Sequence, residues 1–208
     1  MRTSIRTGPG FVPDPALARV PIARSPVAQA GPLQIANGWE VSGRKSAASL
    51  RLADLSQSTK IGVKSADSPF EITYGRSARR GPWIVAGSGP GEWTLLGPVG
   101  ESIDVATTGF ATVIDLTHGR ALMRLTGQRA AMVMSMLCSI DLSEPMCPDG
   151  AAFRASVANL TTDVIRDDVD GTLSYLLHCE RSSGQFLFDA LLDAGTEYGI
   201  DVEGFSWH

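Results

Sequence analysis

The chain has 208 residues, a length that suits one domain, or one domain with an appendage. Hydrophobic residues make up 43% and charged residues 19%, which supports a packed core and argues against a wholly disordered chain. The formal net charge of −4 excludes the basic face of a nucleic-acid-binding protein, and no apolar run reaches the roughly 18 residues of a membrane span. Cys138, Cys147 and Cys179 lack CxxC spacing, so we expect reduced thiols in a cytoplasmic protein.

Residues 1–37 differ in composition from the rest of the chain. Six of the twelve prolines fall in this segment, which is also rich in arginine and has no apolar signal-peptide core. This proline density prevents an amphipathic helix and favours an extended, partly polyproline II segment. It is either a solvated tail or an arm ordered by a partner subunit. We favour the arm because it carries five apolar side chains that a pure linker would lack: Val20, Ile22, Val27, Leu33 and Ile35.

From residue 38 the pattern becomes that of strands. Residues 38–42 read as a strand start, and residues 50–56 and 60–64 alternate apolar and polar side chains, as half-buried strands do. In the second of these, Ile61 and Val63 share one face. We expect a further strand over residues 69–74 and a basic, solvated loop over residues 75–82.

The most aromatic stretch is residues 82–96, PWIVAGSGPGEWTLL. Its two strand-like runs flank Ser-Gly-Pro-Gly, which predicts a hairpin because glycine gives backbone freedom and proline fixes φ. A phosphate-binding loop is rejected because the Gly-Lys-Ser/Thr ending is missing and a strand follows. Residues 98–109 are expected to contain a short helical turn.

The second half predicts strands and two helices. Ile114, Leu116, Met123 and Leu125 fit strand core positions, and residues 128–138 form a run without Gly or Pro that favours a helix. Strands are expected over residues 153–158, 163–166 and 172–179. The buried face expected for the last helix consists of Phe186, Leu187, Ala190, Leu191 and Ala194. Ser182 is its expected N-cap, and Gly195 ends it unless it continues through Tyr198.

No motif for catalysis or metal binding stands out. His118, His178 and His208 lack ligand spacing, and no GxSxG, GxGxxG or GK[ST] sequence occurs. Four aspartates between residues 163 and 170 fit solvated turns and strand edges. We therefore assign no catalytic, cofactor-binding or metal-binding residue from the motifs.

Four short motifs, in order, resemble one family. Residues 89–96, GPGEWTLL, resemble the GP-x-EW-x-LL motif of the γ subunit of heterotetrameric sarcosine oxidase. Residues 124–143, with the Pro-Asp-Gly turn at 148–150, resemble its strand, glycine turn, helix, Asp-Leu and Pro-Gly order. Residues 181–183 and 188–191 resemble its terminal Arg-Ser and Phe-Asp-x-Leu helix. The resemblance covers roughly residues 41–200.

The resemblance implies a fold. These γ subunits are similar to the folate-binding aminomethyltransferases (glycine cleavage T-proteins), which implies an α+β domain of antiparallel sheets with ferredoxin-like β-α-β units. That domain would span residues 38–208 and follow an extended Pro-rich arm, residues 1–37. In that superfamily a strand glutamate holds folate, but the corresponding residue here is Leu176, which cannot accept a hydrogen bond. Asp163 stands near the place of the family's catalytic aspartate, but Thr161 and Thr162 replace the preceding glycines.

The resemblance also implies a function. The chain would be a non-catalytic γ-type subunit of a flavin-dependent sarcosine or N-methyl amine oxidase, bracing α, β and δ-type subunits. Those partners would carry FAD, FMN, NAD and tetrahydrofolate. The apolar side chains of the arm and Trp93 of the hairpin would contact them. Two alternatives stay open: a stand-alone folate-dependent aminomethyltransferase or folate-binding protein, and an interaction module without an oxidase.

Overall fold

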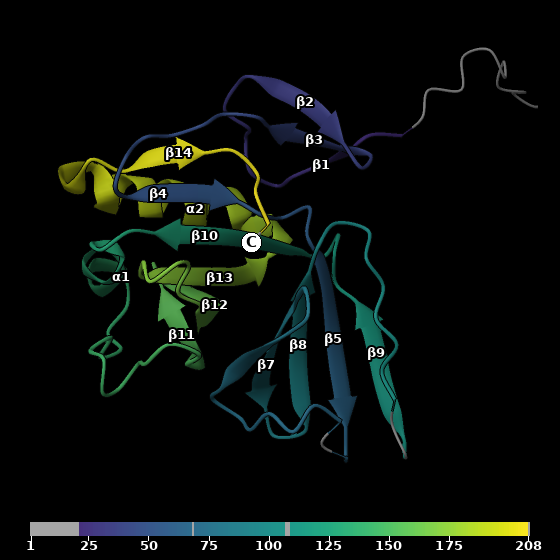
Figure 1. The fold of residues 1–208 in the computed structure, drawn as a ribbon. Coiled ribbons are helices and arrows are strands. Elements are labelled where there is room, and N and C mark those ends of the chain that lie inside the picture. Colours follow the sequence, from purple (N-terminus) through teal and green to yellow (C-terminus); the bar gives the residue numbers. More distant parts are fainter. Residues whose placement is uncertain (1–20, 68, 107–108, 208) are drawn as a thin grey trace, which may run out of the picture.

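The computed structural model describes residues 21–67, 69–106 and 109–207. These residues form three β-sheets and two helices, and Figure 1 shows the smallest sheet at one end of the molecule. This small sheet has the order β1-β3-β2, with β1 parallel and β2 antiparallel to β3. Its strands are β1 (Ala23–Arg24), β2 (Leu33–Ala36) and β3 (Trp39–Ser42).

The central layer is a six-stranded sheet of order β11-β12-β13-β10-β4-β14. Adjacent strands in this sheet are antiparallel except for β14, which runs parallel to β4. The long strand β10 is central because it pairs with β13 on one side and β4 on the other. The strands are β4 (Arg51–Asp54), β10 (Arg120–Thr126), β11 (Ala152–Val157), β12 (Leu160–Arg166), β13 (Ser174–Glu180) and β14 (Asp201–Glu203).

The third sheet has five antiparallel strands in the order β6-β7-β8-β5-β9. Its strands are β5 (Thr59–Ser65), β6 (Ser77–Arg80), β7 (Trp83–Gly89), β8 (Glu92–Gly97) and β9 (Ala111–Asp115). The predicted hairpin is confirmed, because β7 pairs directly with β8.

Two predictions for this region are wrong. The expected basic loop over residues 75–82 contains strand β6, and the strand expected over residues 69–74 is absent apart from an isolated bridge at Tyr74. β6 is an edge strand, so it needs only main-chain pairing with β7 on one side. Edge strands commonly carry charged side chains, which is why Arg79 and Arg80 obscured it in the sequence.

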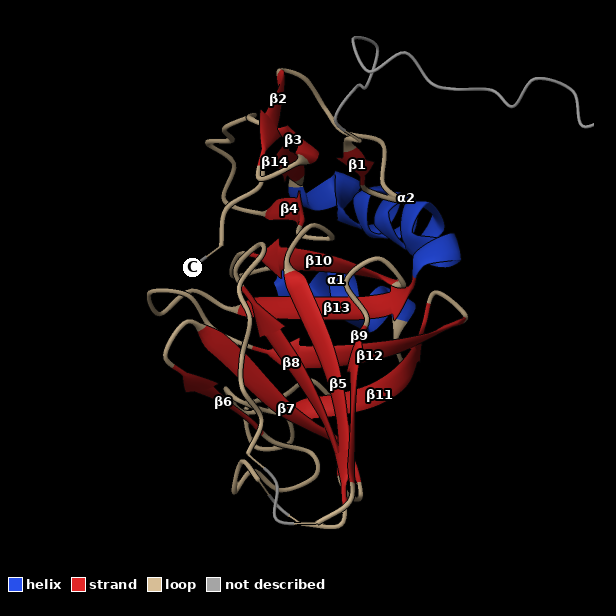
Figure 2. Ribbon diagram, turned by 90° about the vertical axis from the view of Figure 1, so that its right-hand side faces the viewer, coloured by secondary structure: helices blue, strands red, loops and turns tan. Residues whose placement is uncertain are grey.

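Both predicted helices are confirmed. They are α1 (Ala130–Leu137) and α2 (Gly184–Gly195), the latter flanked by the short 3₁₀ turns η2 (Arg181–Ser183) and η3 (Thr196–Tyr198). Figure 2 shows the two helices together on one face of the six-stranded sheet. No helix in the described part of the chain is both long and apolar enough to cross a membrane.

The buried face of α2 differs from the prediction at two positions, since Phe186 is exposed and Ala190 is only half-buried. Leu187, Leu191 and Ala194 are buried as expected, but Phe186 is 58% exposed. Phe188 takes its place in the core, since successive helix residues are rotated by about 100° and the sheet lies on the side of Leu187 and Phe188. The α-helix ends at Gly195 as predicted, and one 3₁₀ turn then continues to Tyr198.

Gly127, between β10 and α1, occupies a turn that requires glycine, as the strand, glycine turn and helix order in the sequence suggested. Gly127 has φ of +147°, which side chains rarely adopt. A Cβ atom at this position would lie 2.3 Å from the Ser49 carbonyl oxygen. Only glycine therefore allows α1 to fold back closely onto the sheet.

The core consists of three apolar layers. The largest lies between the helices and one face of the six-stranded sheet and includes Met123, Tyr175 and Leu191. The second lies between the two large sheets and includes Leu122, Leu96 and Leu176. The third covers the outer face of the five-stranded sheet around Trp83 and Trp93. Alternate residues of β10 and β13 thus serve two different layers.

The two helices differ in how they connect the strands of the six-stranded sheet, which bears on the expected ferredoxin-like β-α-β units. α2 joins β13 to β14, which run in the same direction with β10 and β4 between them. α1 joins β10 to β11, which run in opposite directions with β13 and β12 between them. Only α2 therefore makes a β-α-β crossover, and a ferredoxin-like unit stays a prediction.

The described part of the predicted arm, residues 21–37, packs on the domain. Val27 is 3% exposed and belongs to the helix–sheet core. The Gln29 side-chain amide donates to Asp54 Oδ2 at 2.6 Å, and its oxygen accepts from the Ser42 amide at 3.2 Å. The expected boundary at residue 37 is therefore misplaced, because it divides the β1-β3-β2 sheet. The remainder of the predicted arm, with Val20, lies outside the described residues.

Replacing Val27 by alanine should lower the free energy of unfolding by about 1–3 kcal/mol, because it leaves a cavity in the core. The matched control is Leu33→Ala, whose side chain is 53% exposed. That change should stay within about 0.5 kcal/mol of the unmodified chain. Urea unfolding of the isolated protein measures both. Equal effects of the two changes would show that residues 21–37 do not pack on the domain in solution.

Candidate functional site

Leu176 lies where the resemblance would place a folate-binding carboxylate. It is on β13, opposite Arg124 of β10, and its side chain is completely buried. The surrounding side chains belong to the apolar layer between the two large sheets. Apolar side chains therefore fill the space around Leu176, and its own side chain has no polar group to orient a ligand.

Asp163 of β12, the second position suggested by the resemblance, is held by two arginines and lies beside His178. Its carboxylate accepts from Arg154 Nε at 2.7 Å, lies 3.5 Å from Arg120 Nη2, and lies 3.7 Å from His178 Nδ1. Burial alone would raise the pKa of Asp163, but His178 and Arg154 together hold it below its usual value. Asp163 is therefore an ionised structural anion, whereas a general acid would need a raised pKa.

The space beside Asp163 is too small for a substrate. The cavity lined by Asp163, His178, Phe153 and neighbouring residues has a volume of about 10 Å³. That volume corresponds to at most one water molecule. The position near the family's catalytic aspartate therefore has no room for a substrate in this structure.

Lys60 is a buried cation with a lowered pKa, and the sequence analysis did not single it out. It alternates with Ile61 and Val63 and was expected on the polar side of a strand, yet it is fully buried. Its ammonium donates to the Ser56 and Ser58 carbonyl oxygens at 2.7 and 2.8 Å. Burial lowers the pKa of Lys60 to about 7, against the opposing effect of Asp54 and Asp115. The start of β5 lies where the two large sheets meet, and that junction buries it.

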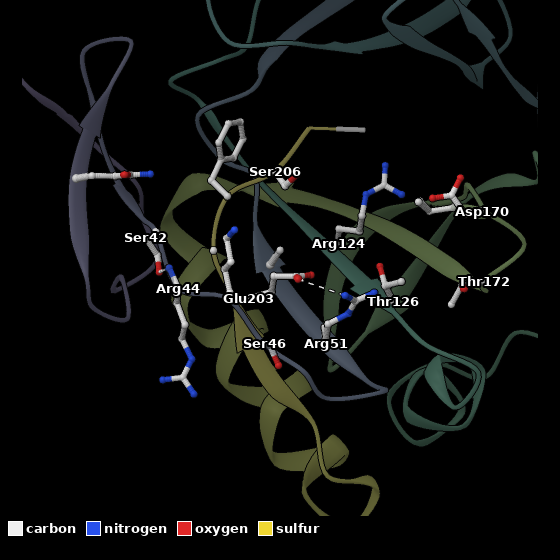
Figure 3. Close-up of a pocket in the computed structure, with 17 residues that line it drawn as sticks. Ser42, Arg44, Ser46, Arg51, Arg124, Thr126, Asp170, Thr172, Glu203 and Ser206 are labelled. Carbon is white, nitrogen blue, oxygen red and sulfur yellow. Dashed lines mark hydrogen bonds and ion pairs between the residues drawn. The ribbon is translucent and has the colours of Figure 1, made fainter.

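A cavity with a volume of about 540 Å³ lies among the described residues. Figure 3 shows it between the small sheet, strands β4 and β10, and the chain after β14. Its polar lining residues include Arg51, Arg124, Thr126, Asp170 and Glu203. These residues are far apart in the sequence, and no sequence motif links them.

Ion pairs fix most of the charged groups around this cavity. Arg51 Nη1 lies 3.3 Å from Glu203 Oε1, which connects β4 to β14. Arg44 pairs with Asp201 at 2.7 Å. Lys45 also lines the cavity, is exposed, and has no ion pair with any residue that the structure describes. The cavity is thus bordered by more cations than anions.

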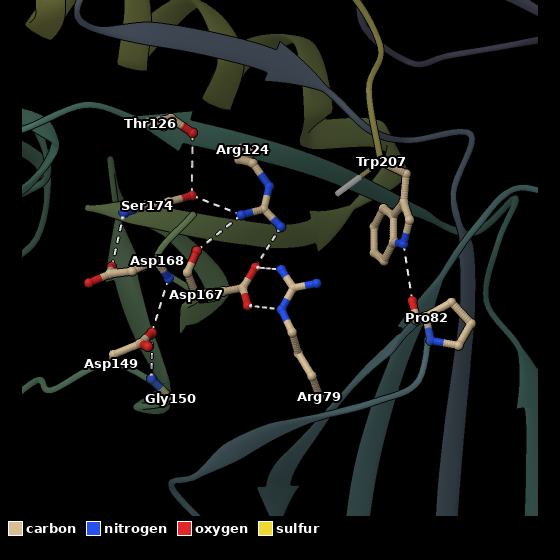
Figure 4. Close-up of polar contacts among 10 residues, drawn as sticks. All are labelled: Arg79, Pro82, Arg124, Thr126, Asp149, Gly150, Asp167, Asp168, Ser174 and Trp207. Carbon is tan, nitrogen blue, oxygen red and sulfur yellow. Dashed lines mark hydrogen bonds and ion pairs between the residues drawn. The ribbon is translucent and has the colours of Figure 1, made fainter. Parts of the chain in front are cut away.

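Arg124 is the most deeply buried of these cations, with 4% of its side chain exposed. Figure 4 shows its guanidinium held by Asp167 and Ser174, while Asp167 also binds Arg79 of β6. Burial lowers the pKa of Arg124, Asp167 opposes the shift, and the nearby Arg79 adds to it. The signal for this residue in the sequence is weak, because it is only an arginine inside the apolar run of β10.

The predicted subunit contacts fall into two groups. Ile22, Leu33 and Ile35 are 50%, 53% and 56% exposed; Leu33 and Ile35 lie on β2 of the small sheet, and Ile22 directly precedes β1. Val27 and Trp93 are core residues of this chain, and the Trp93 indole donates to the Ile72 carbonyl at 2.9 Å. The expected contact through Trp93 therefore has no exposed indole to support it.

Among the described residues, no group of three or more His, Cys, Asp or Glu side chains is arranged to hold a metal ion. The cysteines Cys138, Cys147 and Cys179 are buried free thiols. Burial raises the pKa of Cys179 to about 11, which disfavours a reactive thiolate.

Comparisons with known proteins define the fold class. No family model matches the chain. The structure resembles a chain of the heterotetrameric sarcosine oxidase from Corynebacterium sp. U-96, with a TM-score of 0.64 and 20% identity, over 74% of this chain and 88% of that chain. It also resembles the glycine cleavage aminomethyltransferase T from Bartonella henselae, with a TM-score of 0.65 and 15% identity, over 83% and 55% of the two chains. The predicted aminomethyltransferase-like fold is thereby confirmed.

One curated relative matches at the level of sequence. Human mitochondrial dimethylglycine dehydrogenase is 27% identical over 129 residues, which are 58% of this chain and 15% of that protein. This chain therefore spans only a small part of that relative. The comparisons establish a shared fold, and they leave the activity of this chain to be argued from its own residues.

His178 should make stability depend on pH. Burial lowers the pKa of His178 in the folded protein, while the unfolded value is about 6.5. Below about pH 6.5 the unfolded chain therefore binds more protons, so stability falls as the pH decreases, by at most about 1.4 kcal/mol per pH unit for one proton. Urea unfolding at about pH 7.5 and 5.5 should show a larger loss for the unmodified chain than for His178→Phe. Equal losses would contradict a buried neutral histidine.

Proposed function

We propose that this chain is a non-catalytic γ-type subunit of a flavin-dependent heterotetrameric oxidase of sarcosine or a related N-methyl amine. The observation that carries the proposal is the sealed apolar position of Leu176. The small, arginine-bound surroundings of Asp163 support it, since both sites suggested by the superfamily lack room for a substrate. Support also comes from the likeness to a sarcosine oxidase chain over 88% of that chain.

In this proposal the chemistry belongs to other subunits. Partners of the α, β and δ types would carry FAD, FMN, NAD and tetrahydrofolate, while this chain braces them. No residue described above offers a dinucleotide or flavin site with a recognised motif. A bracing role needs only a stable surface, which the packed three-layer core provides.

The small sheet is the surface best suited to partner contact. Leu33 and Ile35 are two residues apart on β2, so they point to the same side of the strand. β2 is an edge strand, because the sheet order places it next to β3 only. Exposed apolar side chains at a sheet edge are typical of a surface that another chain covers.

A stand-alone folate-binding protein or aminomethyltransferase is the second candidate. It is favoured by the likeness to aminomethyltransferase T over 83% of this chain and by the cavity of about 540 Å³. The burial of Leu176 argues against it, since a folate site needs a hydrogen-bonding group there by the resemblance.

Titration with tetrahydrofolate separates the two candidates. We expect no binding by the isolated chain, because Leu176 supplies no acceptor and is enclosed by apolar neighbours. Isothermal titration calorimetry with tetrahydrofolate, using a glycine cleavage aminomethyltransferase as the positive control, measures this. Micromolar binding by this chain would reject the non-catalytic proposal in favour of the second candidate.

Assembly is tested by charging the small sheet. In the native host, a tagged chain should co-purify with subunits that show flavin absorbance. The double change Leu33→Asp with Ile35→Asp should reduce the co-purified flavin about tenfold, since burying two carboxylates in an apolar contact is costly. The matched control is Val113→Asp on β9, where the side chain is 51% exposed. Equal flavin content in both variants would exclude the small sheet as the contact, and absence of any flavoprotein would reject the proposed function.

A further inference from the structure

We infer that the cavity between the small sheet and the six-stranded sheet binds a small organic anion, one with a carboxylate or phosphate group attached to an apolar body. This cavity, termed here the basic cavity, is lined by Arg51, Lys45, Arg124, Phe205 and the other residues around it shown in Figure 3. The inference concerns this chain alone and does not rest on the proposed subunit role.

The size of the basic cavity fits one small molecule. Its volume of about 540 Å³ lies within the range of roughly 300–1,000 Å³ that is usual for ligand sites. Its walls come from segments before, within and after the central sheet. They include Gln34 of β2, Arg51 of β4, Thr126 of β10, Thr172 and Ser206. A ligand in this position would contact both the small sheet and the chain after β14.

The charge of the lining points to an anion. Four of its side chains are cationic. Arg44, Arg51 and Arg124 pair with Asp201, Glu203 and Asp167, while Lys45 has no ion pair with any described residue. This group of cationic side chains occurs in a chain whose net charge is −4, so it does not reflect the overall composition. Local positive charge in a concave site raises the concentration of anions there. Hydroxyl groups of Ser42, Thr172 and Ser206 in the same lining are further hydrogen-bond donors.

Two buried guanidinium Nε atoms, one on the buried Arg124 and one on the half-buried Arg51, supply the second observation. The Nε atoms of Arg124 and Arg51 are buried and have no hydrogen-bond partner among the described residues. A buried donor without a partner costs about 1–3 kcal/mol, more when it is charged. Burial lowers the pKa of Arg124, Asp167 opposes the shift, and the nearby Arg79 adds to it. An anion in the basic cavity would stabilise both guanidinium groups electrostatically.

The apolar part of the lining indicates that the ligand is more than a simple ion. Phe205 is half-buried and also packs against the layer between the large sheets, and Val169 and Ala53 line the same cavity. An aromatic wall next to cations fits a molecule with a ring or chain attached to its anionic group. Leu176 is not part of this lining, so the site differs from the position equated above with the folate carboxylate.

The test uses the full-length purified chain and three probes: phenyl phosphate, inorganic phosphate and neutral benzyl alcohol. We expect phenyl phosphate to bind with a Kd near or below about 1 mM and to raise the melting temperature. Inorganic phosphate should bind about tenfold more weakly because it lacks the contact with Phe205, and benzyl alcohol should not bind. Calorimetry at low and high salt should show weaker binding at high salt.

Lys45 supplies the variant, because it is exposed and no described residue pairs with it, so its replacement spares the fold. Lys45→Ala should weaken phenyl phosphate binding at least about fivefold, and Lys45→Arg should retain it. The matched control is Arg80→Ala on β6, an exposed cation outside the lining. The inference fails if phenyl phosphate does not bind at about 10 mM, if benzyl alcohol binds equally well, or if Arg80→Ala weakens binding as much as Lys45→Ala.

Discussion

The carboxylate of Asp167 connects the two large sheets, and the rest of the arrangement depends on this contact. It accepts from Arg124 of the six-stranded sheet at 2.7 Å and from Arg79 of the five-stranded sheet at 3.0 and 2.7 Å (Figure 4). Removing one member of a buried ion pair costs about 3–5 kcal/mol, because the remaining charge stays buried without compensation. With both arginines present, this contact favours one mutual position of the sheets.

The mutual position of the two large sheets determines which residues of β10 and β13 are buried between them and which line the basic cavity. Where the sheets meet, Leu122 and Leu176 are covered, so the site suggested by the superfamily is filled with apolar side chains. Beyond the edge of that contact, the same face of the sheet carries Arg124 and Thr126 and opens into the basic cavity. A single sheet face therefore combines a sealed core with a charged recess.

The likeness to aminomethyltransferase T extends over most of the chain, yet function resides in individual side chains on a fold. Here the positions that matter are a leucine and an aspartate bound by arginines. The fold is therefore shared with an aminomethyltransferase, whereas the side chains at these two positions differ from those that the superfamily would place there. Leu33 and Ile35 of β2 are exposed apolar side chains at a sheet edge, so this edge is the surface on which the proposed assembly can be tested.

The sequence by itself determined the elements with strong local signals. The helix at residues 128–138, the hairpin around Gly89–Gly91 and the end of the last helix at Gly195 depend on propensity and turn chemistry, which act over a few residues. Only the tertiary structure decided the burial of Lys60 and Val27, the pairing of the edge strand β6 and the composition of the basic cavity. Each of these features results from contacts between segments distant in the sequence. The pattern of residues within one segment does not specify which other segment packs against it.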